Sequence, residues 1–496
     1  MLFNSYVFLL LFLPSTWILF RIASIFRGID AAVTLLMLAS LFFYSYWNPP
    51  FVFLILFSII FNYSWGRLIG ESFVEDALKR RSCLYIGMAV NLLLIAYFKY
   101  TNFLLSNIAL IGGWHWTNKE IFLPLGISFF TFQQIAYLID CFKNSMYKNY
   151  TFTQYALFVS FFPQLIAGPI VRYEQIMPQL VRLRTFGFSY KNMVMGISLL
   201  SLGLLKKLFI ADTLALWVTP VFDGSHSVTL FEAWGGTLCY AFQIYFDFSG
   251  YSDMALGLGR LFNIELPLNF NSPYKAFSIS DFWKRWHISL STFLKDYLYI
   301  PLGGSHNGKV RRYVNLMITM LLGGLWHGAS WNFVAWGALH GLYLCIHHGF
   351  RSLFPRIRIP SFWGRSITFS AVVLAWIPFR APSLSRAMEI FEGILGNNGS
   401  FLPPHWIPVS FLQELAQKMG IEVVFMPDWA FSGPRREHLT ILFVLFIAAV
   451  LSFFFPNSYD FVRHSKSNTV FRVLAFLLVV AVFFIGRESE FLYFQF

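Results

Sequence analysis

Charged residues are scarce in this sequence. Asp, Glu, Lys and Arg make up 12% of its 496 residues, whereas hydrophobic residues make up 57%. Typical soluble domains carry about 25% charged residues, because most of their surface faces water. The low charge excludes an ordinary soluble enzyme and predicts an integral membrane protein.

Several common site patterns are also missing. The four cysteines, Cys83, Cys141, Cys239 and Cys345, lie far apart in the sequence and have neither metal-like nor paired spacing. No glycine-rich phosphate loop, GxSxG elbow or HExxH pair occurs. We therefore expect no disulfide framework, no bound metal and no permanently bound cofactor.

Long apolar runs recur from the N-terminus almost to Phe496. A helix needs about 20 apolar residues to cross a bilayer, so these runs predict an all-α, polytopic protein with about 11 to 13 membrane segments. The first run has no basic region before it and no small-residue cleavage site after it, and we expect it to be retained. The predicted segments lie near residues 6–22, 30–47, 50–67, 83–104, 120–139, 153–168, 193–210, 229–247, 313–333, 334–349, 366–380, 439–455 and 469–486.

The net charge of +13 is concentrated in short loops. Such basic loops are expected on the cytoplasmic side of a membrane protein, where most of these charges only orient the helices. The chain lacks the basic soluble face that a nucleic-acid-binding domain needs, so no nucleic-acid partner is expected. The basic loops centre on residues 79–81, 172–191, 309–312 and 351–358.

Two polar stretches interrupt the apolar pattern of a single membrane-embedded domain spanning residues 1–496. Residues 263–312 are too charged to cross as a simple helix and predict interfacial or re-entrant helices. Residues 381–438 read as a polar insertion with two surface helices, SRAMEIFEGIL and SFLQELAQKM. No internal repeat is apparent, which disfavours inverted-repeat transporter folds.

Histidines in the central region are the first functional candidates. His287 and His327 lie 40 residues apart, the first in the polar stretch 263–312 and the second in the motif LLGGLWHGASW. A neutral imidazole can take a proton from a hydroxyl near neutral pH. The alternative is a histidine that only bonds a backbone carbonyl in a helix bundle. Glycines around His327 leave space for a ligand, and Trp326, Trp331 and Trp336 predict rigid walls.

Further ionisable residues lie in apolar surroundings. Asp247 and Asp253 interrupt a glycine-rich run, and a carboxylate there must be paired, hydrated or protonated. They could orient a histidine or a lysine, but we favour a structural pairing, for example with Arg260. Arg172 could bind an anionic phosphate or simply pair with Glu174.

Five motifs together carry a family resemblance. The chain resembles the membrane-bound O-acyltransferase family, and within it the bacterial branch typified by the membrane subunit of alginate O-acetylation. The resemblance covers about residues 1–380 and the last residues. The motifs are FPQLIAGPIVRY, YFDFSGYSDMALGLGRLFNIELPLNFNSPY, SISDFWKRWHISLSTFLKDYLYIPLGG, LWHGASWNFVAWGALHG and FLYFQF.

The resemblance implies a helical bundle with a central funnel or tunnel and two catalytic positions, His327 and His287. It implies that an acyl group, with acetyl-CoA as the donor, passes from the cytoplasm to a hydroxyl. In this branch the acetyl group passes to periplasmic acetyltransferase or SGNH-type partner proteins that modify an exopolysaccharide or cell-wall glycan. The expected location is the bacterial inner membrane, in contact with membrane lipids. The expected lining residues of the tunnel or donor site are Trp326, Trp331, Asp247, Asp253, Arg172 and Lys284.

Two alternatives remain open on the sequence. A transporter or channel would also contain buried histidines, aspartates and a broken glycine-rich helix. A lysolipid acyltransferase of the same family would use the same chemistry on a lipid hydroxyl, although the alginate-type motifs disfavour it.

Overall fold

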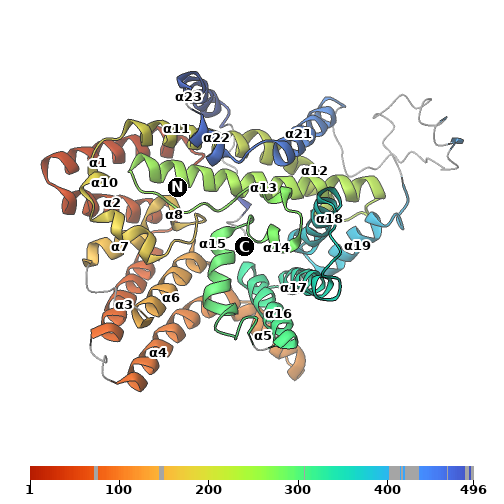
Figure 1. The fold of residues 1–496 in the computed structure, drawn as a ribbon, viewed down its shortest axis with the longest axis horizontal. Coiled ribbons are helices and arrows are strands. Elements are labelled where there is room, and N and C mark those ends of the chain that lie inside the picture. The colour runs from red at the N-terminus through yellow and green to blue at the C-terminus, as the bar shows by residue number, and fades with distance from the viewer. Residues whose placement is uncertain are drawn as a thin grey trace.

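The computed structural model of the chain is built from helices, and no strand occurs in the part of the chain that it describes (Figure 1). That part comprises residues 1–71, 76–143, 150–306, 308–400, 414, 417–418, 435–465, 467–485 and 491–492. The all-α prediction is confirmed.

The N-terminal helices form antiparallel pairs at one end of the molecule (Figure 1). Asp76 caps the start of α4 by accepting the backbone N–H groups of Leu78 and Lys79, and these bonds lower the pKa of its carboxyl. The pair α1 and α2 lies beside α7, and α3 and α4 pack on α6. The bounds are η1 Val7–Phe12, α1 Leu13–Phe26, α2 Ile29–Ser45, α3 Phe51–Glu71, α4 Ala77–Ile95, η2 Ala96–Tyr100, α5 Thr101–Gly112, α6 Ile127–Lys143 and α7 Phe152–Ser160.

A long buried helix, α13, runs through the middle of the molecule (Figure 1). It extends from Leu230 to Leu261 and packs most extensively on α11. Glycines allow this close approach, because a Cβ on Gly257 would lie 2.6 Å from the carbonyl oxygen of Gly196. The helices around it are α11 Tyr190–Leu205, η4 Lys206–Ala211, α12 Asp212–Asp223, α21 Arg435–Phe454, α22 Ser458–His464 and α23 Asn468–Phe483.

The polar stretch 263–312 folds as short helices joined by irregular backbone, as the sequence predicted. Two longer helices, α16 and α17, follow it and pack closely on each other. They are followed by α18 and the surface helix α19. The bounds are η5 Pro273–Lys275, α14 Ile279–Phe282, α15 Ile288–Leu294, η6 Lys295–Tyr299, α16 Gly308–His327, α17 Trp331–Leu353, α18 Ser361–Arg380 and α19 Leu384–Ile394.

Six stretches in the described part of the chain are long and apolar enough to cross a membrane. Two of them, Ala77–Gly112 and Tyr190–Asp223, continue through π-helical turns well beyond the predicted segments. The protein is therefore a multi-pass membrane protein. The stretches are Val7–Phe26, Phe51–Gly70, Ala77–Gly112, Tyr190–Asp223, Ser361–Arg380 and Arg436–Phe454, and α2 and α23 are shorter apolar helices.

The prediction of one membrane helix near residues 153–168 is wrong. Residues 153–168 do not make one helix, because α7 ends at Ser160 and the four-residue helix α8 covers Phe162–Leu165. The backbone between them, at Phe161, leaves the helical region with ψ 109°, and Pro163 then lies in the first turn of α8, where its missing N–H is tolerated. At nine residues, α7 is too short to cross hydrocarbon.

The polar insertion is partly described. Its first predicted surface helix is α19, which packs on α13 and α18. The second, SFLQELAQKM, lies largely outside the described residues.

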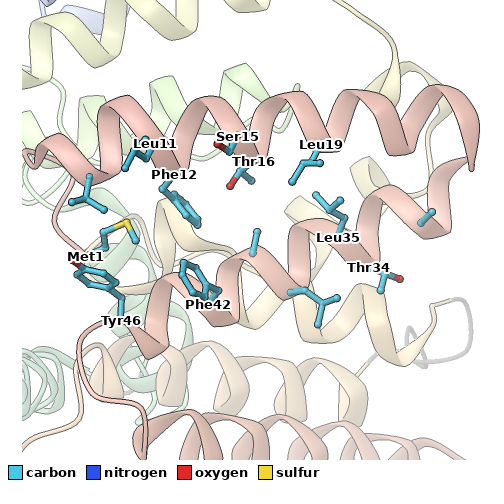
Figure 2. A pocket seen from close by; sticks show the side chains of 14 residues that line it. Met1, Leu11, Phe12, Ser15, Thr16, Leu19, Thr34, Leu35, Phe42 and Tyr46 are labelled. Atoms are coloured by element: carbon cyan, nitrogen blue, oxygen red, sulfur yellow. The ribbon is translucent and has the colours of Figure 1, made fainter.

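A pocket of about 840 Å³ opens between α1 and α2 (Figure 2). Its wall is mostly apolar and includes Phe12, Leu35 and Phe42, with the hydroxyl groups of Thr16 and Thr34 among them. None of the predicted site residues lines it. Because it lies between two apolar helices, we assign it to the membrane-facing surface.

Candidate active site

His327 is the last residue of α16 and is 4% exposed. Gly328 follows directly in the connection to α17. A Cβ added at Gly328 would lie 2.0 Å from the ring of Phe333 in α17. The glycines of the LLGGLWHG motif therefore allow close packing of α16 against α17 rather than open space around the histidine. Aromatic rings surround the imidazole, with centroids at 4.8 Å for Trp326, 5.0 Å for Trp336 and 5.1 Å for Phe379.

His287 immediately precedes α15 and is fully buried. Its backbone is left-handed, with φ 42° and ψ 56°, a conformation that is uncommon for residues other than Gly, although Asn, Asp and His adopt it more often than most. The backbone N–H of Ile288 donates to the carbonyl of Asn269 at 2.9 Å and holds this turn. Strained backbone persists where the surroundings fix it, which is typical of functional sites.

Asn269 also determines how the His287 ring is oriented. Its Oδ1 lies 3.0 Å from Nδ1 of His287 and accepts the hydroxyl of Ser289 at 2.9 Å. Because this oxygen is an acceptor, Nδ1 of a neutral His287 carries the hydrogen and Nε2 is left as the acceptor atom. This tautomer suits proton or hydrogen-bond acceptance at Nε2, whereas polarising a carbonyl would need an N–H there.

Trp326 brings the two histidines together. Its ring centroid lies 6.1 Å from that of His287 and 4.8 Å from that of His327. The indole also stacks on Phe132 of α6 at 5.5 Å. The two imidazoles thus share one buried aromatic neighbour, although 40 residues separate them in the sequence.

Trp331 lies away from this cluster. It is 55% exposed, and its indole N–H donates to Oδ1 of Asn107 in α5. Trp336, which the sequence also predicts as a wall residue, lies beside His327, one turn and a half further along α17. Trp331 is the first residue of α17, and Ser330 caps this helix by accepting the backbone N–H of Asn332.

His340 lies behind Trp336 and is buried among aromatic rings, with centroids at 4.8 Å for Trp336 and 5.2 Å for Trp283. It packs as a structural neighbour of the cluster.

Asp247 and Asp253 form ion pairs with two consecutive lysines of η4. Asp247 lies 2.8 Å from Lys207, and Asp253 lies 2.6 Å from Lys206. The pairing with Arg260 was wrong, since Arg260 pairs with Glu265. These carboxylates hold α13 to η4, and Asp247 also accepts the backbone N–H of Leu492 at 3.0 Å.

Arg172 pairs with Asp296 of η6 at 2.5 Å, and not with Glu174. Its guanidinium also lies over the Tyr297 ring at 5.3 Å, and the Tyr297 hydroxyl donates to Asp140 at 3.0 Å. This cluster joins the loop before α9 (Tyr173–Leu180) to η6 and the end of α6. A phosphate bound by Arg172 would share the guanidinium with Asp296.

Lys284 is exposed between α14 and α15. The side chain that bonds the His287 ring is that of Asn269, which in turn accepts the hydroxyl of Ser289.

Sequence reasoning missed two residues of this region, Asn269 and Lys99. Asn269 stands in the motif PLNFNSPY, where nothing distinguishes it from Asn271. Lys99 could have been noticed in the sequence. No other Asp, Glu, Lys or Arg occurs between Arg81 and Lys119, and an isolated charge in such an apolar run indicates a functional or structural role. Its ammonium donates to the carbonyls of Trp326 at 2.6 Å and His327 at 3.0 Å.

No group of three or more His, Cys, Asp or Glu side chains with metal-binding geometry occurs among the residues whose placement is described. Two buried imidazoles in an aromatic shell are suited to proton transfer away from bulk water.

Comparison with known proteins identifies the family. The membrane-bound O-acyltransferase family pattern matches residues 47–388, which include both histidines. The chain belongs to the membrane-bound O-acyltransferase family. It is accordingly an O-acyltransferase, and the transporter alternative is set aside.

Three relatives illustrate the range of the similarity. The peptidoglycan O-acetyltransferase of Helicobacter pylori is 39% identical and aligns with 100% of this chain and 98% of its own length. The probable alginate O-acetylase AlgI of Pseudomonas aeruginosa is 41% identical over 79% of this chain and 75% of its own. The teichoic acid D-alanyltransferase of Streptococcus thermophilus is 26% identical over 51% of this chain and 68% of its own.

Proposed function

We propose that this membrane-bound O-acyltransferase moves an acetyl group from cytoplasmic acetyl-CoA to a hydroxyl acceptor, across the bacterial inner membrane. The acetyl group then reaches an exopolysaccharide or cell-wall glycan through periplasmic partner proteins of the acetyltransferase or SGNH type. The observation that carries this proposal is the pair of buried imidazoles joined by Trp326, in a chain whose relatives are O-acetyltransferases.

The names of the relatives support a glycan as the final acceptor. Two of them are named for O-acetylation of peptidoglycan and of alginate, both polymers outside the cytoplasm. A third is named for transfer of D-alanine to teichoic acid, another cell-envelope polymer. The lysolipid alternative has no such support, so we favour a glycan or a protein carrier over a lipid.

In the proposed reaction His327 is the general base. Its imidazole takes the proton of the attacking hydroxyl while the oxygen bonds to the thioester carbonyl carbon. The tetrahedral oxyanion then re-forms the carbonyl and expels the thiolate of coenzyme A, which takes up the proton from the imidazolium. The ester is formed and the base is restored.

In this reaction His287 orients a reacting group through Nε2, the acceptor atom of the tautomer that its bond to Asn269 sets. The surrounding rings of Trp326 and Phe248 exclude water, which would otherwise hydrolyse the thioester. The proposed path of the acyl group is a funnel or tunnel that ends at these two histidines.

The proposal is tested with purified protein in liposomes. Acetyl-CoA labelled in its acetyl group is supplied on the cytoplasmic face, and release of coenzyme A and transfer of label are measured with and without a glycan acceptor and a periplasmic partner protein. We expect label in the glycan only when the partner is present. Labelling of a lysolipid instead would favour the lipid alternative, and no thioester cleavage with any acceptor would refute the proposal.

A further inference from the structure

The last turn of α16, which carries His327, is held by two consecutive side chains of another helix. The Lys99 ammonium donates to the carbonyls of Trp326 and His327, and the Tyr100 hydroxyl donates to the carbonyl of Leu325 at 2.6 Å. The last four carbonyls of an α-helix have no partner within the helix. Three of these four are therefore satisfied by two side chains from η2.

The π-helical turn explains how two neighbouring residues reach the same target. Residues at i and i+1 of a regular α-helix do not face a common neighbour. Lys99 and Tyr100 lie in η2, a five-residue π-helical segment between α4 and α5. Such turns are rare, and they frequently occur at functional sites.

Placing the charged side chain of Lys99 in an apolar helix costs free energy, so the lysine needs defined partners. It stands within the apolar stretch Ala77–Gly112, where an ionisable side chain is costly unless it has a defined partner. Its partners are the negative end of the α16 dipole and the Trp326 ring, whose centroid lies 6.0 Å from Nζ. The charge is thus directed at the residues next to and including His327.

We propose that Lys99 is a positioning residue for His327, and that it acts by capping the C-terminal end of α16, with Tyr100 as the second donor of the cap. The assignment of a reaction to His327 rests on the proposed function, whereas the capping contact itself is independent of it. Without the ammonium, the carbonyls of Trp326 and His327 lose their donors and the last turn of α16 loosens. The imidazole then leaves its place beside Trp336 and Phe379.

The test compares Lys99→Met, Lys99→Arg and Tyr100→Phe with Lys79→Met as the control. Lys79 lies near the start of the same helical stretch, and its side chain is 69% exposed. Methionine keeps the length of the lysine side chain but cannot donate, whereas arginine keeps the charge and the donors. Each variant is reconstituted in liposomes, and both acetyl transfer and hydrogen exchange are measured.

For Lys99→Met we expect kcat to fall by at least about tenfold, because a small displacement of a reacting group can cost up to about 100-fold. KM for acetyl-CoA should change by less than about twofold, since substrate binding is not the interaction removed. Amide hydrogens of residues 324–328 should exchange faster. Lys99→Arg should restore most of kcat and the slow exchange, Tyr100→Phe should show a smaller effect, and Lys79→Met should show none.

The two readouts separate this proposal from the proposed function. If the wild-type protein transfers no acetyl group, the proposed function fails, and the exchange of residues 324–328 still decides whether Lys99 caps the helix. Unchanged exchange in Lys99→Met would overturn the capping role, whatever the activity. Faster exchange with an unchanged kcat would overturn the positioning role.

Discussion

The Oδ1 atom of Asn269 lies 3.0 Å from Nδ1 of His287, and this contact determines which nitrogen of His287 accepts. The same asparagine holds the left-handed turn at His287 through its backbone carbonyl. One buried residue thus controls both the backbone and the ring of a proposed site histidine.

Replacing Asn269 by alanine should lower both stability and activity. The substitution leaves the Nδ1–H of His287 and the hydroxyl of Ser289 without their common acceptor, and a buried group left without its partner costs about 1–3 kcal/mol. Thermal unfolding in detergent and acetyl transfer should both decline. Asn192→Ala, which removes a half-buried bond to Asn263, is the control and should leave acetyl transfer unchanged.

The two histidines should respond differently to asparagine. Asparagine tolerates the left-handed backbone at 287 and can form hydrogen bonds, but it cannot act as a base near neutral pH. His287→Asn should therefore keep measurable activity, His287→Ala less, and His327→Asn almost none, when all three are assayed in matched membranes. Equal and complete loss in both asparagine variants would mean that the two histidines act as one proton-transfer unit.

Breaking the ion pair between Lys207 and Asp247 should destabilise the protein strongly. Both side chains are at most 3% exposed, so Lys207→Met leaves a buried carboxylate without its main partner and should cost about 3–5 kcal/mol. Thermal unfolding of the solubilised protein measures this loss. The double variant Lys207→Met/Asp247→Asn should recover part of it, and a double variant less stable than Lys207→Met would contradict the account.

The basic loops should share the cytoplasmic side of the membrane. The Arg80 guanidinium donates to the carbonyl of Phe142 at 2.6 Å, which places the loop before α4 at the C-terminal end of α6. The positive-inside rule predicts that residues 79–81, 172–191 and 351–358 all face inward. Single cysteines placed in these loops should resist a membrane-impermeant thiol reagent in intact cells, and strong labelling from outside would reverse the orientation.

The sequence predicted the helical class and the interrupted segment 263–312, because each depends on local composition. It also singled out the two histidines, whose catalytic role stays a prediction. A histidine or a run of polar residues is conspicuous in an apolar chain. The partners of Asp247 and Arg172 were not predicted, because Lys207 and Asp296 are 40 and 124 residues away from them. Such pairings follow from tertiary packing, which hydrophobic periodicity does not encode.

Trp331 and Trp336 illustrate the same limit at shorter range. Both follow His327 in the sequence, and only the structure shows that Trp336 packs on it whereas Trp331 is exposed. Lys99 lies 228 residues from His327 and was visible only as an isolated charge. A single sequence therefore indicates that a residue is unusual, whereas the structure shows what it contacts.

The central claim is that His327 is the base of the acetyl transfer, and the variant His327→Ala tests it most directly. Acetyl transfer from labelled acetyl-CoA should fall by about 10²- to 10⁴-fold, which is typical for loss of a positioned base. The variant should still insert and accumulate as the wild type does, because the imidazole contributes only part of an aromatic cluster built mainly from Trp326, Trp336 and Phe379. Near-wild-type acetyl transfer by a normally inserted His327→Ala protein would contradict the account.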